Sequence, residues 1–417
     1  MNVLYLAHRI PYPPDKGDKI RSFHQIRALS ERHRIALVCF ADDADDLRHA
    51  AALREFCSSV DVVYRSPRAA RIAGLRGLLD GRSLSEAAFD SAALRRAVGT
   101  RLGPADVAVA FSSVMAQYVP SGSRIPRVMD FVDIDSDKWR LYAERRRGPA
   151  AWIYAREARR LGRYEEQVAR EWDHSLFVSG REERLLAARV PGRPFTVLQN
   201  GVDLAHFNPA FAGATAPAAP ARNGGGHGEA LRIVFTGVMD YFPNVDGVRH
   251  FCASIFPRIR AALPEARFVI VGRNPARAVR ALARQPGVEV TGTVPDVRPH
   301  LAGAAVSVAP LRIARGLQNK ILEAMAMGLP VVGTSAAFEG LDAMRQAGAR
   351  VADDPEAFAT HVVELLRSPE RRREAGSRAR AYVERHHRWS DHGVALEALL
   401  TRVVAGASRP PGREAVT

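Results

Sequence analysis

The sequence has no long apolar run. No segment approaches the roughly 18 consecutive apolar residues that a membrane-spanning helix requires. The opening residues, MNVLYLA, are apolar but few, and no basic residue precedes them. Because a signal peptide has a basic start and a longer apolar core, we expect this segment to be a first β-strand.

Cysteine is also scarce. Cys39, Cys57 and Cys252 are far apart, odd in number and without the spacing of a metal-binding motif. The pattern indicates buried thiols in a reducing cytosol, so we expect a cytoplasmic protein.

Acidic residues are too few to balance the basic ones. The chain has 60 Lys and Arg against 45 Asp and Glu, a formal net charge of +15. Such an excess suits nucleic acid, an anionic membrane face or anionic substrates, and it can also reflect a GC-rich genome. The arginines are spread through both halves and no nucleic-acid-binding module is recognisable, so we expect no nucleic-acid partner.

Length and pattern predict an α/β protein of two domains. With 417 residues and 47% hydrophobic residues, the chain can form two cores of about 200 residues each. Short apolar segments alternate with helices, which predicts parallel sheets covered on both faces. The strands are expected at 3–7, 35–40, 60–64, 107–111, 127–132, 175–179 and 195–199, and then at 232–237, 267–272, 288–292, 306–310 and 331–334.

The expected domains are two doubly wound, Rossmann-like units that face each other across a cleft. The N-terminal domain is expected at 1–209 and the second domain at 231–385. Residues 210–230, rich in Ala, Pro and Gly, are expected to form a flexible linker. Residues 386–417 should form a C-terminal helix that packs back toward the N-terminal domain, followed by a tail. Ligands of such sheets bind beyond the carboxyl ends of the strands.

The most informative segment is 316–332 (GLQNKILEAMAMGLPVV). It follows a strand and predicts a helix from about Gln318 to Met327 with a glycine at its entrance. A helix N-terminus presents free N–H groups and a partial positive charge, which suit a diphosphate. Lys320 and Glu323 share one helical face, so Glu323 could accept two ribose hydroxyls. The alternative is a solvent-facing Lys–Glu pair on an ordinary helix.

An acidic group follows the strand at 127–132. Asp133 and Asp135 have the DxD spacing by which some enzymes hold a divalent metal at a diphosphate. They could instead lie at a helix N-terminus, with Asp135 or Ser136 as its cap. In a third interpretation Asp133 bonds a sugar hydroxyl or the acceptor nucleophile. All three remain open from the residues alone. His8 is expected to be polar filler at a strand end, and His386 and His387 to be surface residues.

A basic, aromatic stretch runs from Lys138 to Arg170. Arg156, Arg159, Arg160 and Arg163 share one face of a predicted amphipathic helix. This face could be merely solvated. Alternatively, it could contact an anionic inner leaflet or a polyprenyl-diphosphate acceptor, with about 1 kcal/mol from each basic residue near the surface.

The chain resembles the GT-B-fold glycosyltransferases of family four, the retaining class that uses nucleotide-activated sugars. The resemblance spans nearly the whole length and rests on segments 320–332, 199–203 and 234–237. More narrowly, segments 11–21, 130–139 and 315–320 are similar to sugar transferases of exosortase-associated exopolysaccharide systems.

The resemblance implies that the domain at 1–209 is the acceptor-side domain and that the domain at 231–385 binds the nucleotide-sugar donor. It also implies roles for particular residues. Glu323 would hold the donor ribose, and the backbone at Gly316 and Leu317 would meet the diphosphate. Asp133 falls where relatives have a histidine beside the transferred sugar, so it is the candidate catalytic residue. The full set of expected donor-binding residues is Gly17, Asp18, Gly237, Asn244, Arg315, Gly316, Leu317, Gln318, Asn319, Lys320 and Glu323.

The chain also departs from the family pattern. Many relatives carry a second glutamate eight residues before the one at Glu323, and Arg315 stands there in this chain. Many have an Arg and a Lys after the equivalent of Gly237, where this chain has Met239, Asp240 and Asn244. We expect Lys320 or Arg315 to supply the missing positive charge.

The resemblance implies a hexosyltransferase that retains anomeric configuration and needs no metal or cofactor besides its donor. The donor would be a nucleoside diphosphate sugar. The acceptor would be a growing glycan, linked to a polyprenyl diphosphate, in exopolysaccharide synthesis. The enzyme would work in the cytoplasm, with peripheral attachment to the inner membrane face. The alternative is a nucleotide-sugar epimerase or hydrolase of the same fold.

Overall fold

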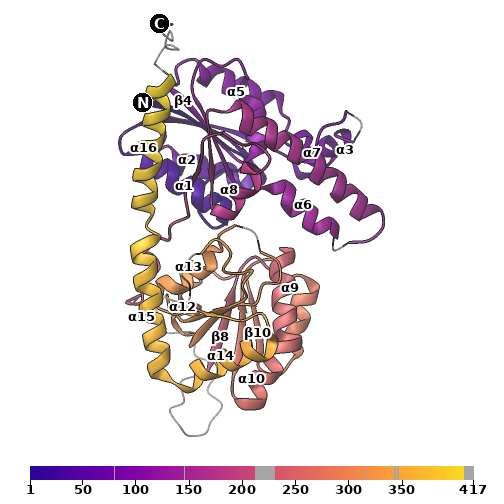
Figure 1. Cartoon of the computed structure of the whole chain (residues 1–417), viewed down its shortest axis with the longest axis vertical. Coiled ribbons are helices and arrows are strands. Elements are labelled where there is room, and N and C mark those ends of the chain that lie inside the picture. Colours follow the sequence, from indigo (N-terminus) through magenta and orange to yellow (C-terminus); the bar gives the residue numbers. More distant parts are fainter. Residues whose placement is uncertain are drawn as a thin grey trace, which may run out of the picture. The chain divides into compact units, whose positions relative to one another are not determined.

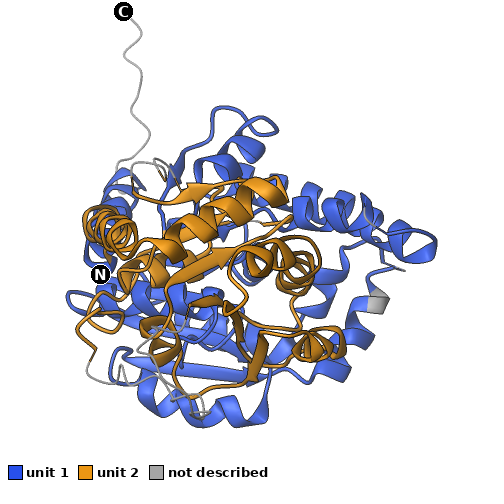
Figure 2. Ribbon diagram, turned by 90° about the horizontal axis from the view of Figure 1, so that it is seen from below, with its two compact units in different colours: residues 1–199, 389–417 blue, residues 200–388 orange. Residues whose placement is uncertain are grey.

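The computed structural model describes residues 1–407 except 79, 145, 212–230, 315, 342, 343, 345 and 346. Most of the expected linker therefore lies outside the described residues. The chain forms two compact units (Figure 2). Unit 1 contains residues 1–199 and the C-terminal segment from Trp389, and unit 2 contains residues 200–388. Each is described separately below.

Unit 1 is built on a seven-stranded parallel sheet with the order β3-β2-β1-β4-β5-β6-β7. From β1 the chain steps outward to β3 and then returns to β4 on the other side of β1, which is the doubly wound pattern. The predicted strands are all present, and the last two are shorter than expected. Their bounds are β1 (Asn2–Ala7), β2 (Arg34–Ala41), β3 (Ser59–Tyr64), β4 (Val107–Phe111), β5 (Arg127–Val132), β6 (His174–Phe177) and β7 (Phe195–Val197).

Helices cover both faces of this sheet because alternate strand residues bury apolar side chains on each side (Figure 1). On one face, the final helix packs on the first, and Leu396, Leu399 and Leu400 share a core with Ile26 and Leu29. The helices are α1 (Gly17–Ser30), η1 (Ala44–His49), α2 (Ala50–Leu53), α3 (Pro67–Arg76), α4 (Leu84–Ala88), α5 (Ala92–Leu102), η2 (Ser113–Tyr118), α6 (Asp135–Glu144), α7 (Pro149–Glu171), α8 (Gly180–Ala187) and α16 (Trp389–Ala407).

The basic stretch predicted near Lys138–Arg170 forms two helices, α6 and α7. They lie side by side and extend beyond the strands of the sheet (Figure 1). The chain reverses at Gly148, whose φ of 70° suits glycine, and Pro149 begins α7 with its fixed φ. Within the described residues, no helix combines the length and apolarity needed to cross a membrane.

Unit 2 has a six-stranded parallel sheet with the order β10-β9-β8-β11-β12-β13. Five of its strands were predicted. The sixth, β13, has only two residues at the sheet edge, too few for an apolar pattern to show. The bounds are β8 (Arg232–Thr236), β9 (Arg267–Val271), β10 (Val288–Gly292), β11 (Val306–Ala309), β12 (Val331–Gly333) and β13 (Arg350–Val351).

The helices of unit 2 pack around an aromatic core in which Phe251 lies 4.4 Å from Phe268 and 6.0 Å from Phe358, between ring centroids. They are α9 (Phe242–His250), η3 (Phe251–Ile255), α10 (Phe256–Ala262), α11 (Arg277–Arg280), η4 (Ala281–Arg284), α12 (Arg298–Ala302), α13 (Asn319–Ala326), α14 (Pro355–Arg367) and α15 (Pro369–His386). The prediction of a surface position was wrong for His387. Its side chain is buried and its Nδ1 lies 3.0 Å from the carbonyl oxygen of Asn200, to which it donates.

Two glycines meet where β8 and β9 end. A Cβ added to Gly272 would lie 1.6 Å from the carbonyl oxygen of Gly237, so no side chain fits there. We expect Gly272→Ala to lower the free energy of unfolding by about 1–3 kcal/mol. Gly99→Ala is the matched control. It lies inside α5 with nothing within 4 Å of the added Cβ, and should raise stability by up to about 1 kcal/mol. Equal thermal denaturation midpoints for the two variants would contradict this packing argument.

Candidate functional site

The entrance of α13 is open to an anion. Its N-cap residue Gln318 makes no capping hydrogen bond through its side chain, and Gly316 turns the chain there with a φ of 61°. Gly316 and Leu317 are both buried in this structure. The partial positive charge of a helix N-terminus therefore stays uncompensated by a cap. Arg315 lies outside the described residues.

Lys320 joins α13 to the ends of β8 and α9. Its Nζ donates to Asn244 Oδ1 at 2.5 Å and lies 4.3 Å from the centroid of the Phe235 ring. Asn244 in turn donates from Nδ2 to the carbonyl oxygen of Val238 at 2.9 Å. A Cβ on Gly237 would lie 2.8 Å from Asn244 Nδ2 and 3.2 Å from Lys320 Nζ. Three of the expected donor-binding residues, Gly237, Asn244 and Lys320, are thus in one cluster.

Glu323 lies one turn further along α13 and is half-buried. Burial raises the pKa of its carboxyl to about 7, against the opposing effect of Lys320. Burial likewise lowers the pKa of Lys320 to about 7, against the opposing effect of Glu323. Among the described residues, nothing donates a hydrogen bond to the Glu323 carboxylate. Lys320 thus has a hydrogen-bond partner in Asn244, whereas the Glu323 carboxylate has no donor among the described residues.

Asn200 supports α13, although it was not among the residues predicted to form the site. Its Nδ2 donates to Asn319 Oδ1 at 3.0 Å, at the first residue of the helix. Asn200 is buried, and its carbonyl oxygen accepts from His387. The signal was present in the sequence, since segment 199–203 was one of the motifs that carried the resemblance. The motif gave no indication that its side chain reaches α13.

In unit 1, Gly17 begins α1 and Asp18 follows it. The Asp18 carboxylate accepts from Arg9 Nη1 at 2.8 Å and lies 3.3 Å from His8 Nε2. Hydrogen bonding and charge from His8 and Arg9 outweigh burial and hold the pKa of Asp18 well below its usual range. The carboxylate is therefore already committed to protein partners, which leaves the backbone at Gly17 as the more accessible group. His8 stacks on Phe111 and contacts Asp18, so it is more than the filler expected.

Asp133 follows β5 after Val132, which has a φ of 65°. The side chain is half-buried, and its Oδ1 is enclosed without a hydrogen-bond partner. Burial and the neighbouring carboxylates of Glu182 and Asp135 raise the pKa of Asp133. A carboxyl group in this state can remain protonated near neutrality and donate to a substrate oxygen.

The neighbours of Asp133 do not support a DxD metal site. Asp135 pairs with Lys138 at 2.5 Å, and Asp130 is fully buried against Arg21 at 2.8 Å. Among the described residues, no three His, Cys, Asp or Glu side chains are arranged to hold a metal ion.

The predicted local cap of α6 is replaced by carboxylates from other helices. Ile134 N–H donates to Glu182 at 2.8 Å and Ser136 N–H to Glu165 at 3.2 Å. Glu165 interrupts the apolar stripe of α7 in the sequence. It is buried, and its carboxylate accepts from the backbone at the start of α6. Its burial raises the pKa of its carboxyl to about 8.

The arginine stripe of α7 contains three exposed members. Arg159, Arg160 and Arg163 are exposed, in agreement with the helical spacing. Arg156 is half-buried and donates to the carbonyl oxygens of Gly77 at 2.7 Å and Arg82 at 3.2 Å. The prediction was therefore wrong for Arg156, which fixes the chain before α4 and cannot serve as a surface contact.

The cluster of Gly237, Asn244 and Lys320 lies in a segment that matches a protein family. Residues 230–368 match the family model described as Glycosyl transferases group 1. This segment is a glycosyltransferase group 1 domain. It contains Gly237, Asn244, Lys320 and Glu323, so the enzyme class expected from the sequence is confirmed. No curated protein matches the chain.

Solved structures agree with the GT-B fold predicted for the chain. Sucrose-phosphate synthase from Thermosynechococcus elongatus is 15% identical over 97% of this chain and 100% of its own, with a TM-score of 0.74. HepE of Anabaena, solved with UDP-glucose, is 16% identical over 96% of this chain and 100% of its own, with a TM-score of 0.66. WaaG, a glycosyltransferase involved in lipopolysaccharide biosynthesis, is 15% identical over 96% of this chain and 99% of its own, with a TM-score of 0.62.

The opposed pKa shifts of Lys320 and Glu323 predict a bell-shaped pH dependence. Below pH 7 Glu323 becomes protonated and is a weaker acceptor for hydroxyls, and above pH 7 Lys320 loses the charge that attracts a diphosphate. The affinity for a nucleoside diphosphate sugar, whose phosphates do not titrate there, is expected to be highest near pH 7. It should fall by up to about tenfold per pH unit on each side.

Calorimetric titration between pH 5.5 and 9 measures this profile. Lys320→Met should remove the alkaline decline and Glu323→Gln the acidic one. A flat profile for the unmodified protein would show that neither group titrates where the ligand binds.

Proposed function

We propose that the protein is a retaining hexosyltransferase that moves a sugar from a nucleoside diphosphate sugar to a glycan. The observation that carries the proposal is the half-buried Glu323 carboxylate, to which no described residue donates a hydrogen bond. Two ribose hydroxyls would satisfy it, one turn from a helix entrance that suits the diphosphate. The UDP-glucose in the structure of the relative from Anabaena supports a uridine nucleotide as the first donor to test.

The same residues account for stabilisation of the leaving group. As the bond to the sugar breaks, negative charge grows on the diphosphate. The N–H groups at the entrance of α13 and the ammonium of Lys320 would stabilise it there. Lys320 is held by Asn244 and Phe235, so it needs little reorganisation during the reaction. In this mechanism these groups meet the diphosphate charge, and no metal or other cofactor is needed.

Asp133 is proposed to act on the acceptor side. Its raised pKa and its enclosed, unpartnered oxygen suit a hydrogen bond to a sugar or acceptor hydroxyl. An epimerase or hydrolase of the same fold would need only a donor site. Identification of the product separates these activities, because only a transferase gives a larger glycan.

We further propose a lipid-linked acceptor in exopolysaccharide synthesis, used at the cytoplasmic membrane face. Trp152, near the beginning of α7, is 61% exposed, and Arg159, Arg160 and Arg163 are exposed on the same helix. An amphipathic aromatic side chain and a row of cations suit an anionic interface. The role of a relative, WaaG, in lipopolysaccharide biosynthesis is compatible with such an acceptor.

The donor site is tested by Glu323→Ala. Loss of a charge-assisted acceptor worth about 1.5–3 kcal/mol should weaken binding of the nucleotide sugar by about tenfold or more. Glu265→Ala, at an exposed glutamate in the loop before β9 of unit 2, is the matched control and should leave affinity unchanged. Thermal shift and calorimetry measure both. Wild-type affinity in a folded Glu323→Ala variant would remove this residue from the site.

Membrane attachment is tested by changing Arg159, Arg160 and Arg163 together to Gln. At about 1 kcal/mol per residue, partitioning to anionic phospholipid vesicles should fall by roughly 100-fold. The charge-matched control changes Arg267, Arg277 and Arg284, which are exposed in unit 2. Vesicle sedimentation that decreases equally in both variants would assign the effect to net charge and reject a specific contact.

A further inference from the structure

The helix α13, whose entrance is proposed to meet the donor diphosphate, is short. It has eight residues, Asn319–Ala326. At 1.5 Å per residue it is about 12 Å long, or roughly two turns. Few hydrogen bonds hold so short a helix in place from within. The position of the N–H groups at its entrance therefore depends also on what holds its C-terminal end.

Arg380 holds the C-terminal end of α13. It lies on α15, which packs on α13 (Figure 1). Its Nη1 donates to the carbonyl oxygen of Ala326, the last residue of α13, at 2.5 Å. The carbonyl groups in the last turn of a helix have no partner within the helix, and a cation there compensates the negative end of the helix dipole. Arg380 therefore satisfies this end of α13 both as a hydrogen-bond donor and as a charge.

The same guanidinium joins α13 to the segment that begins at Asn200. Its Nη1 also donates to the carbonyl oxygen of Phe207 at 2.6 Å, and its Nη2 donates to that of Leu204 at 3.4 Å. At the other end of the segment, the side chain of Asn200 donates to Asn319, the first residue of α13, at 3.0 Å. One stretch of chain is therefore attached to both ends of the helix, directly at its start and through Arg380 at its end.

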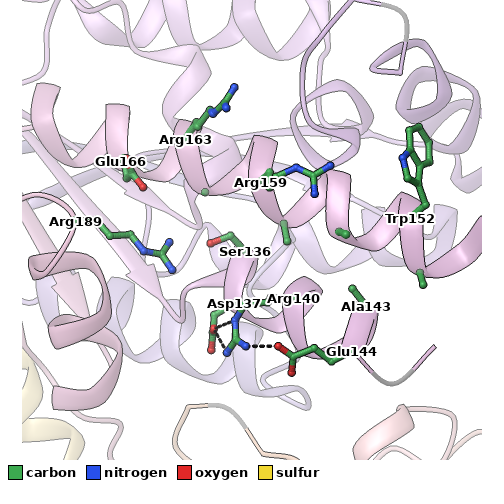
Figure 3. Close-up of a pocket in the computed structure, with 14 residues that line it drawn as sticks. Ser136, Asp137, Arg140, Ala143, Glu144, Trp152, Arg159, Arg163, Glu166 and Arg189 are labelled. Atoms are coloured by element: carbon green, nitrogen blue, oxygen red, sulfur yellow. Dashed lines mark hydrogen bonds and ion pairs between the residues drawn. The ribbon is translucent and has the colours of Figure 1, made fainter. Parts of the chain in front are cut away.

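The Arg380 side chain is oriented by its own helix. Its Nε donates to Glu384, one turn further along α15, at 2.6 Å. Such pairs within one helix are common at the surface, as Arg140 shows with Asp137 and Glu144 on α6 (Figure 3). In Arg380 the pair uses Nε and leaves both terminal nitrogens for carbonyl groups outside α15. The planar fork is thereby fixed in the direction of α13.

The backbones of α15 and of the residues after α13 also meet. A Cβ added to Gly376 in α15 would lie 1.9 Å from the carbonyl oxygen of Gly328, two residues after the end of α13. No side chain fits between them, so the contact is made by backbone atoms. The end of α13 is therefore held against α15 by close packing as well as by the guanidinium of Arg380.

We propose that Arg380 is a positioning residue for donor binding, which holds α13 so that its entrance, Lys320 and Glu323 meet the nucleoside diphosphate in the required geometry. The inference rests on the proposed function and adds a residue that acts on it from the opposite end of the helix. The effect can be large, because a displacement of about 1 Å in the groups that hold a reacting substrate can lower a rate by about 100-fold.

The helix α15 contains a matched control for this proposal. Arg372 is half-buried, like Arg380, and its Nη1 donates to the carbonyl oxygens of Leu366 at 2.7 Å and Leu365 at 3.2 Å, in the last turn of α14. It satisfies the end of a helix in the same way, but α14 carries none of the expected donor-binding residues. Loss of either arginine should destabilise the fold, whereas only loss of Arg380 should affect the donor.

The first test needs no ligand. Hydrogen–deuterium exchange is measured on the free protein at a temperature where all variants are folded. Arg380→Met should speed exchange of the α13 amides by about tenfold or more, because a charge-assisted hydrogen bond at the end of the helix is lost. Arg372→Met should speed exchange in α14 and leave α13 unchanged. Exchange in α13 that is the same in Arg380→Met and in the unmodified protein would overturn the proposal.

The second test is kinetic. Arg380→Met should lower the affinity for the nucleoside diphosphate sugar and kcat by about tenfold each, because the displaced N–H groups meet the diphosphate less well both before and during bond breaking. Arg380→Lys keeps the charge without the planar fork, so both values should lie between those of the Met variant and the unmodified protein. It also provides the test if Arg380→Met does not fold.

The outcomes separate a positioning role from a merely structural one. Arg372→Met should change affinity and kcat by less than about twofold, since α14 is remote from the site. Equal kinetic effects of Arg380→Met and Arg372→Met would reduce Arg380 to a structural contact and overturn the proposal. Failure of the unmodified protein to bind any nucleotide sugar would overturn the proposed function and this inference with it. Normal donor binding with unchanged kinetics in Arg380→Met would count against Arg380 alone.

Discussion

The conformation of unit 1 depends on a buried ion pair between Arg21 and Asp130. Both side chains are fully buried, and Arg21 Nε donates to Asp130 at 2.8 Å. Burial of two charges is stabilising only when their remaining donors and acceptors are satisfied. Arg21 Nη1 also donates to the carbonyl oxygen of Leu198 at 2.7 Å, and Gln25 donates to Asp130 at 2.7 Å. Loss of either charged partner would leave the other uncompensated, at a cost of about 3–5 kcal/mol.

This pair connects elements that are far apart in the sequence. Gln25 also contacts Nε2 of His392 in α16 at 3.2 Å, and Nδ1 of His392 donates to the carbonyl oxygen of Gln199 at 2.9 Å. Burial and the charge of Arg21 lower the pKa of His392 well below its ordinary value, so the ring is neutral and can accept from Gln25. The chain leaves unit 1 after Gln199 and re-enters it at Trp389. The hydrogen bonds of Gln25 and His392 therefore hold the two segments where the chain exits and returns.

The carboxylates of Asp130 in unit 1 and Glu323 in unit 2 differ in how their charge is compensated. In unit 1 the Asp130 carboxylate accepts from Arg21, Gln25 and the N–H of Val132, so its needs are met within the protein. In unit 2 the Glu323 carboxylate is half-buried with no such donor among the described residues, and burial raises its pKa. A half-buried carboxylate without a donor has lost part of its hydration, and hydroxyl groups of a ligand could replace it. This difference favours Glu323 over Asp130 as a candidate binding residue.

Much of this could be predicted from the sequence, because short apolar strands and a glycine before a helix are local patterns. All the strands except β13, and the helix at Asn319, were found in that way. The predictions that failed concern residues whose hydrogen-bond partners are far away in the sequence. Arg156 has the spacing of a surface stripe, but its donors reach Gly77, 79 residues away. His387 looks like a tail residue, but it binds the carbonyl of Asn200, 187 residues away. No periodicity within a helix contains that information.

The same limit applies to the net charge of +15. Some of the basic side chains are engaged inside the fold: Arg21 is paired with Asp130, and Arg156 is bound to backbone carbonyls. A total charge therefore does not indicate where an anion would bind. What matters is whether each guanidinium has a partner, and on α7 this changes within one turn. Arg156 is committed to the fold, whereas Arg159 and Arg163 are exposed on the same helix and form no ion pair with a described carboxylate. The position of an anion site therefore depends on which basic side chains the fold leaves without a partner, and not on the total charge.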